Sequence, residues 1–205
     1  MALVPPPSMA VATPADSALP SGADSEQQLL LRARDGDRDA FRALFDSHGP
    51  AVSRYLRDAL GDRTAADEAT QETFVRAHTR LAAVYEADRL RAWLLGIAHR
   101  VFLEACRRRR SAGEHVEISE AEPADVAPSP ELSLLGREAD AVLASALSRL
   151  PAERRSALLL RLDHDLPYER IAEQLDWSVS KVKNEIHRAR LQLRAQLSKY
   201  MGGAL

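Results

Sequence analysis

The segment from Tyr168 to Arg190 constrains the fold more than any other part of this chain. Its second half carries apolar residues at the spacing of one helix face, and the stripe continues beyond it: Val179, Val182, Ile186, Ala189 and Leu193. Polar and basic residues lie largely outside the stripe: Lys181, Lys183, Asn184, His187, Arg188 and Arg190. The pattern predicts a helix with one buried side and one basic side.

A shorter helix precedes it, and the junction has the chemistry of a tight turn. Pro167 suits the first helical position. Asp176 stands where the turn needs a positive φ, which Asp tolerates better than most residues, and Ser178 or Ser180 can cap the next helix. We interpret the pair as a helix-turn-helix, whose second helix fits the major groove of DNA. A plain solvated basic face is the alternative.

The rest of the chain is rich in Ala, Leu, Arg and Glu and shows no strand alternation, which predicts an all-α fold. Four helices are expected in the first half, from Ser25 to about 34, about 37–60, about 64–84 and about 88–110, with Gly61 ending the second. We expect Phe74, Val75 and Trp93 to face inward. The four helices together would form a small helical bundle able to fold alone.

Residues 111–133 differ in character, because they are acidic, contain several prolines and lack periodicity. We predict a flexible linker there. A second helical domain follows at 134–199, where another apolar stripe precedes the helix-turn-helix: Ala139, Val142, Leu143, Ala146, Leu147 and Leu150. Residues 1–24 are predicted to be a disordered arm, and 200–205 a short tail.

The net charge is near zero, with 28 Lys and Arg against 30 Asp and Glu, whereas DNA-binding domains are usually basic. The charges are segregated, however, which suggests several partner surfaces. The single cysteine, Cys106, excludes an intrachain disulfide and a Cys-based zinc site. It is expected in the core, although neighbouring arginines could lower its pKa. The absence of an apolar run of membrane length and of a convincing signal peptide favours a cytoplasmic location.

Three segments in this order resemble one known family. They are AADEATQETFVRAH, RLRAWLLGIAHRVFLEACRRRR and LSRLPAERRSALLLRLDHDLPYERIAEQLDWSVSKVKNEIHRARLQL. Over residues 25–198 the chain is similar to extracytoplasmic-function (ECF) RNA polymerase sigma factors. The resemblance implies that 25–110 is sigma region 2, which binds core polymerase and opens the −10 element. It implies that 134–199 is sigma region 4, which reads the −35 element.

The resemblance also implies the residues of each surface. Core-polymerase binding would fall on an acidic helix face: Asp67, Glu68, Gln71 and Glu72. Contacts with the −10 element would fall on a loop and the following helix: Tyr85, Asp88, Arg89, Arg100, Glu104, Arg107 and Arg108. Contacts with the −35 element would fall on the basic helix: Lys181, Lys183, Asn184, Glu185, His187, Arg188 and Arg190.

Several of these residues depart from the family's usual ones. Arg100 stands where relatives often have Asn, and Glu104 where they often have Asp. In the basic helix, Asn184 and Glu185 replace the usual Ser and Arg. Because Asn can bond adenine and Glu can accept from cytosine, the promoter sequence is expected to be unusual.

The implied partners are bacterial RNA polymerase core, promoter DNA and an anti-sigma factor. No enzymatic activity, cofactor or metal is expected, since no nucleophile–base pair, phosphate-binding glycine loop or metal-ligand spacing is present. Two alternatives remain. A stand-alone helix-turn-helix regulator would bind a palindrome as a dimer. A nucleic-acid enzyme, such as a recombinase, would need a catalytic Ser or Tyr with clustered arginines, or paired carboxylates for a metal, which Asp67, Glu68 and Glu72 could mimic. In a free sigma factor, the linker would leave the distance between the domains undefined.

Overall fold

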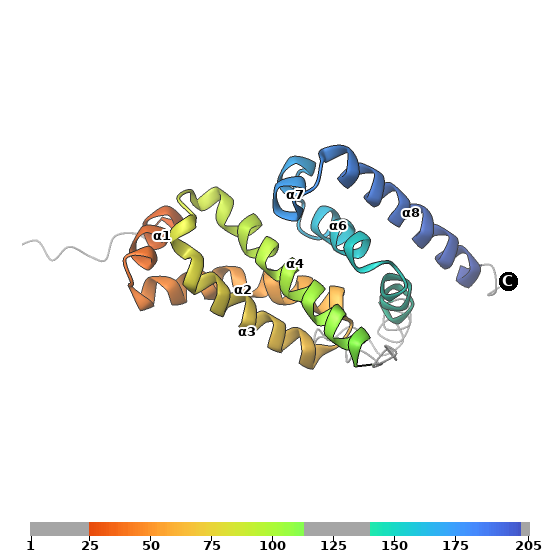
Figure 1. The fold of residues 1–205 in the computed structure, drawn as a ribbon, viewed down its shortest axis with the longest axis horizontal. Coiled ribbons are helices and arrows are strands. Elements are labelled where there is room, and N and C mark those ends of the chain that lie inside the picture. Colours follow the sequence, from red (N-terminus) through yellow and green to blue (C-terminus); the bar gives the residue numbers. More distant parts are fainter. Residues whose placement is uncertain (1–24, 113–139, 202–205) are drawn as a thin grey trace, which may run out of the picture.

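The computed structural model describes residues 25–112 and 140–201, and every secondary-structure element in those ranges is helical (Figure 1). The predicted arm at 1–24, most of the linker at 111–133, the start of the second domain at 134–139 and residues 202–205 lie outside the described ranges. The all-α prediction is confirmed.

The first domain consists of four helices and a 3₁₀ turn: α1 (Glu26–Arg34), α2 (Arg38–Leu60), α3 (Arg63–Arg80), η1 (Leu81–Ala83) and α4 (Ala87–Ser111). Ser25 begins α1 with a reciprocal capping box, in which Ser25 and Gln28 each bond the other's backbone N–H. Gly61 ends α2 in the left-handed conformation at φ 67°, as predicted. The third helix stops at Arg80, earlier than predicted, because the chain tightens into η1.

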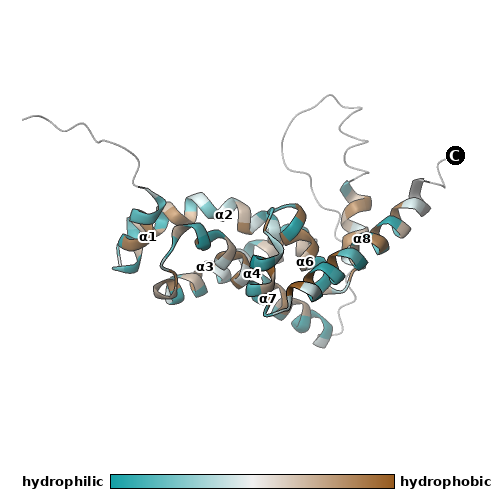
Figure 2. Cartoon of the chain, turned by 90° about the horizontal axis from the view of Figure 1, so that it is seen from above, coloured by the Kyte–Doolittle hydropathy of each residue, from teal (hydrophilic) through white to brown (hydrophobic). Residues whose placement is uncertain are grey.

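Large apolar side chains from all four helices form the core of this domain, including Leu30, Tyr55, Phe74 and Phe102. The prediction that Val75 faces inward is wrong, since its side chain is 60% exposed. The buried residues of α3 lie on the face that contains Phe74, and the next residue is turned about 100° away. Each labelled helix in Figure 2 carries both hydrophilic and hydrophobic residues, as amphipathic helices around a shared core require.

The second domain contains a helix that includes residues 140–148, followed by α6 (Ala152–Leu162), α7 (Tyr168–Leu175) and α8 (Val179–Met201). Asp176 adopts the predicted left-handed conformation at φ 55°, and Ser178 accepts a hydrogen bond from the Lys181 N–H at 3.1 Å. The turn chemistry that predicted a helix-turn-helix is therefore confirmed. Pro167 lies one residue before its helix as the N-cap instead of opening it.

The apolar stripe before α6 is buried only in part. Leu147 and Leu150 belong to the core, whereas Leu143 is 43% exposed, so the prediction that it faces the core is wrong. Leu158 and Leu159 of α6 are buried. They therefore belong to the core of the second domain.

The two domains pack directly against each other. α6 lies against α2 and α4, and α7 lies against α4 (Figure 1). The expectation that a flexible linker leaves the domain spacing undefined is therefore wrong for this structure. The reason is a continuous core, since Leu158, Leu160 and Ile171 belong to the same buried cluster as Tyr55 and Phe102.

A hydrogen-bonded triad crosses the domain boundary. The Ser156 hydroxyl lies 2.6 Å from the Tyr55 hydroxyl and 2.7 Å from Nδ1 of His99, and all three residues are buried. Burial lowers the pKa of His99 to about 4, so its ring is neutral at pH 7 and Nδ1 can accept. The simplest arrangement has Tyr55 donating to Ser156 and Ser156 donating to His99.

Two further contacts complete the boundary. The ring of His164, which is 1% exposed, packs edge-on against the Tyr55 ring, with 5.8 Å between the two ring centres. Gly96 of α4 allows α7 to approach closely, because a Cβ built there would lie 2.3 Å from Oε1 of Gln174 and 3.2 Å from its Cβ. A side chain at position 96 would therefore displace Gln174 or separate the two helices.

We expect Ser156→Ala to lower the free energy of unfolding by about 1–3 kcal/mol, because it leaves two buried polar groups without a partner. Urea unfolding followed by circular dichroism would measure the change. Ser180→Ala, on the exposed side of α8, is the matched control and should stay within about 0.5 kcal/mol of wild type. Equal effects of the two substitutions would contradict the role of the triad.

Candidate nucleic-acid interface

The basic side of α8 is fully accessible in the docked structure. Six of its seven predicted contact residues are exposed: Lys181, Lys183, Asn184, His187, Arg188 and Arg190. The Lys181 ammonium lies 3.8 Å from the centre of the Trp177 ring, so the residue that covers the turn also positions a cation. Val182, Ile186 and Ala189 hold the opposite side in the core. The helix thus presents positive charge and one amide on a rigid surface.

Glu185 is the exception on this helix. Its carboxylate accepts hydrogen bonds from Arg154 of α6 at 2.8 Å and from Arg188 at 3.1 Å, and only 18% of its side chain is exposed. The hydrogen bond from Arg154 holds the pKa of Glu185 below its usual value. Glu185 therefore ties the recognition helix to α6 in this structure. Arg154 was missed from the sequence, because nothing in its local pattern distinguishes it from other exposed arginines.

The loop between η1 and α4 presents Tyr85, whose side chain is 67% exposed. The Arg34 guanidinium lies 4.1 Å from the centre of its ring. Gln27 fixes the backbone on both sides of the loop, since it donates to the Tyr85 carbonyl and accepts from the Ala87 N–H, each at 2.9 Å. The tyrosine is thus an exposed flat surface on a braced loop, suited to stacking against a base.

The helix-turn-helix reaches this loop in the docked structure. Arg170 of α7 forms an ion pair with Asp88 at 3.6 Å, and Arg89 lies 4.0 Å from Glu173 of α7. A pocket of about 220 Å³ lies between this loop and α7. Tyr85, Trp93 and Gln174 are among the residues that line it. Three predicted −10 residues are therefore brought against the second domain. No local pattern predicts this contact, because its partners lie far apart along the chain.

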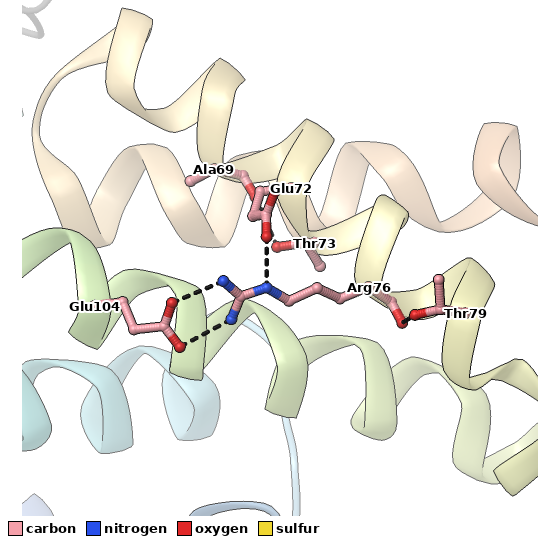
Figure 3. Close-up of polar contacts among 6 residues, drawn as sticks. All are labelled: Ala69, Glu72, Thr73, Arg76, Thr79 and Glu104. Atoms are coloured by element: carbon pink, nitrogen blue, oxygen red, sulfur yellow. Dashed lines mark hydrogen bonds and ion pairs between the residues drawn. The ribbon is translucent and has the colours of Figure 1, made fainter.

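The C-terminal half of α4 carries three exposed arginines among its predicted contacts, Arg100, Arg107 and Arg108. Glu104, on the same helix, is engaged by Arg76 of α3 through two hydrogen bonds of 2.8 and 2.7 Å, and Arg76 also donates to Glu72 at 2.6 Å (Figure 3). This contact lowers the pKa of Glu104. One guanidinium thus links a predicted −10 residue to a predicted core-binding residue.

The acidic face of α3 is accessible over most of its length. Asp67, Glu68 and Gln71 are exposed, and Glu72 is half-buried beside Arg76. Within residues 25–112 and 140–201, no group of three metal-ligating side chains is present, and no helix is long and apolar enough to cross a membrane. Burial raises the pKa of the Cys106 thiol despite the nearby arginines, which disfavours the thiolate form.

Comparison with known proteins agrees with this arrangement. Residues 44–112 match the family described as Sigma-70 region 2, and residues 141–193 match Sigma-70, region 4. The chain is 34% identical to the RNA polymerase sigma factor YlaC of Bacillus subtilis, over 79% of this chain and 94% of that protein. It is 30% identical to the ECF RNA polymerase sigma factor EcfG of Rhodopseudomonas palustris, over 76% of this chain and 82% of that protein.

The chain belongs to the ECF family of RNA polymerase sigma factors. Its fold is similar to that of CnrH, solved in complex with the cytosolic domain of CnrY, with a TM-score of 0.63 and 28% identity over 86% of this chain and 99% of that one. The resemblance drawn from the three sequence segments is thereby confirmed. A sigma factor is a transcription initiation factor, and the stand-alone regulator is not favoured.

We expect Arg154→Gln to raise the pKa of Glu185 toward its ordinary value and to cost about 1–2 kcal/mol of stability, because the ion pair is partly buried. Carboxyl chemical shifts followed over a pH titration would report the pKa. Arg188→Gln removes the exposed partner of the same carboxylate and should cost less than about 0.5 kcal/mol. A larger effect at position 188 than at 154 would refute the assignment.

Proposed function

We propose that this sigma factor uses residues 25–110 to bind core polymerase and open the −10 element, and residues 134–199 to read the −35 element. The observation that carries the proposal is the recognition helix α8, which presents exposed basic and amide side chains and is held by a helix-turn-helix within the region 4 match. The alternative that α8 is only a solvated face does not account for a region 2 match in the same chain.

At the −35 element, Asn184 is the residue best suited to read a base, because it is exposed and its amide can bond adenine through two hydrogen bonds. Lys181, Lys183, His187, Arg188 and Arg190 then contact phosphates and contribute affinity without sequence choice. Glu185 acts as a positioning residue in the state described, since both its oxygens are engaged by arginines. It reads cytosine only if Arg154 releases it.

At the −10 element, Tyr85 provides a stacking surface for an unstacked base, which contributes about 1–3 kcal/mol. Asp88 and Arg89 flank it, and Arg100, Arg107 and Arg108 follow the duplex upstream. Glu104 positions the α3–α4 pair through Arg76. Because α7 forms ion pairs with Asp88 and Arg89, strand capture requires α7 to leave the loop.

The acidic face formed by Asp67, Glu68, Gln71 and Glu72 is proposed to contact core polymerase. Its first three residues are exposed, and the negative charge suits a basic partner surface. Docking on polymerase would hold the two domains at the separation of the −10 and −35 elements. Two weak DNA contacts linked in this way gain an avidity of roughly 10²–10⁴ over either alone.

The remaining features of the proposal follow from this role. The chain performs no covalent chemistry itself and acts in the cytoplasm, where bacterial RNA polymerase transcribes. A protein inhibitor is also proposed, because the homologous CnrH was solved with the cytosolic domain of a partner protein. Such an inhibitor would act as an anti-sigma factor by keeping region 2 and region 4 from their DNA and polymerase contacts.

We expect core polymerase with this protein to begin RNA at a subset of genomic promoters in a reconstituted run-off assay. Glu68→Lys should reduce both the transcript and the affinity for core at least about tenfold, because it reverses a charge in the acidic face. Asp46→Lys, an exposed charge reversal on α2 outside that face, should leave both within about twofold.

Two results would contradict the proposal in different ways. An equal loss of transcript and affinity in both variants would show that the acidic face is not part of the polymerase interface. If the wild-type protein gave no transcript at any genomic promoter, the assignment of sigma activity itself would be contradicted.

A further inference from the structure

A second pocket lies on the other side of the domain boundary, away from the Tyr85 loop. It encloses about 200 Å³ between α2, α4, α6 and the helix that includes residues 140–148. Its polar lining comes from both domains, with Arg109 and Arg110 from the first and Ser148 and Arg155 from the second. None of the described residues that line it is acidic. None of the contacts proposed above for DNA or polymerase uses these four residues.

Arg155 is the unusual residue of this pocket. It is only 8% exposed, and its guanidinium lies 5.3 Å from the centre of the Phe102 ring. Its Nε is buried, and no described residue accepts a hydrogen bond from it. Burial lowers the pKa of Arg155 from its usual value, yet an arginine stays charged in proteins. A buried cation is normally paired, yet none of the carboxylates that the structure describes forms an ion pair with Arg155.

The surroundings of Arg155 add positive charge instead of compensating for it. Arg109 uses one nitrogen to bind Asp62 at 3.0 Å, and Arg110 uses Nε to bond the Cys106 carbonyl at 3.3 Å, which leaves other N–H groups of both free to donate. Arg110 is exposed and can reorient. Three guanidinium groups thus line one small space.

The first turn of α6 also borders the pocket through Ala152. Its N-cap is Pro151, which provides no side-chain hydrogen bond to the free backbone N–H groups of that turn. Glu153, in the same turn, is exposed and does not line the pocket. A helix N-terminus without a side-chain cap, beside several arginines, attracts oxyanions through both its N–H groups and its dipole.

We propose that this pocket binds a small phosphate-bearing anion. The donors come from the end of α4 and from the first turn of α6, where Arg155 adds its guanidinium to the backbone N–H groups. Phosphate, with several acceptor oxygens, can accept from both sets at once. The pocket volume fits inorganic phosphate or a small phosphate monoester. Carrying two negative charges, the ligand would supply the counter-charge that Arg155 lacks.

Binding would couple to the arrangement of the domains, because the site exists only while α6 is docked on α2 and α4. A ligand that binds only the docked form stabilises it by mass action. Phosphate would therefore oppose separation of the domains. Its effect on transcription rests on the proposed function, but binding itself does not.

Isothermal titration calorimetry on the full chain, with inorganic phosphate at constant ionic strength, tests the proposal. We expect saturable binding of one phosphate per chain. Arg155→Gln and Arg110→Gln should each weaken it at least about tenfold, since each removes a charge-assisted contact. Arg108→Gln removes an equal charge two residues from Arg110 but outside the pocket, and should change the affinity less than about twofold.

Titrations with glycerol 3-phosphate and succinate, compared with phosphate, identify the source of the phosphate group. Tighter binding of glycerol 3-phosphate than of phosphate would support an organic monoester, and equal binding would support free phosphate. Absence of saturable binding would overturn the proposal, as would preference for succinate. Equal loss in all three variants would mean an adventitious ion only. Arg110→Gln lies at an exposed position, so it tests the site even if Arg155→Gln unfolds the chain.

Discussion

One buried hydroxyl, added to a continuous apolar core, fixes the geometry in which the two domains dock. Ser156 belongs to the second domain, but its two partners, Tyr55 and His99, belong to the first. Buried polar groups that satisfy one another are favourable only in one geometry, so they select a single docking arrangement from the many that an apolar surface would allow. The neutral state of His99 contributes, because a charged ring could not be buried there without a counter-ion.

This docking gives the free sigma factor two properties that neither domain has alone. It places Arg170 and Glu173 of α7 against Asp88 and Arg89, beside the loop proposed to capture a melted base. It also builds the pocket around Arg155. Separation of the two domains would break these ion pairs at the loop and dismantle the pocket. The recognition helix α8 stays accessible throughout, so the docked form restricts the proposed −10 contacts more than the −35 contacts.

Local features could be predicted from the sequence, and features that depend on tertiary contacts could not. The αL residue Asp176, the cap Ser178 and the stripe through Val182 and Ile186 determined the helix-turn-helix, because turn chemistry and helical periodicity are local. Val75 was misplaced because the buried face of α3 passes through Ala66, Phe74 and Ala77, and Val75 is turned away from it. The domain docking was missed because its signals are single residues far apart in the sequence, Ser156 between a charged segment and an apolar run and Gly96 opposite Gln174. The hydrogen bonds of Glu104 and Glu185 to arginines were missed for the same reason, because those arginines lie on other helices.

In the free chain the domains are docked, and we expect them to separate on polymerase. Energy transfer between dyes at Ser47→Cys and Ser198→Cys, both exposed positions, in a Cys106→Ala background would measure it directly. The account predicts high transfer in the free protein and a marked fall when core polymerase and promoter DNA are added. Low transfer in the free protein, or a value unchanged by polymerase, would contradict it.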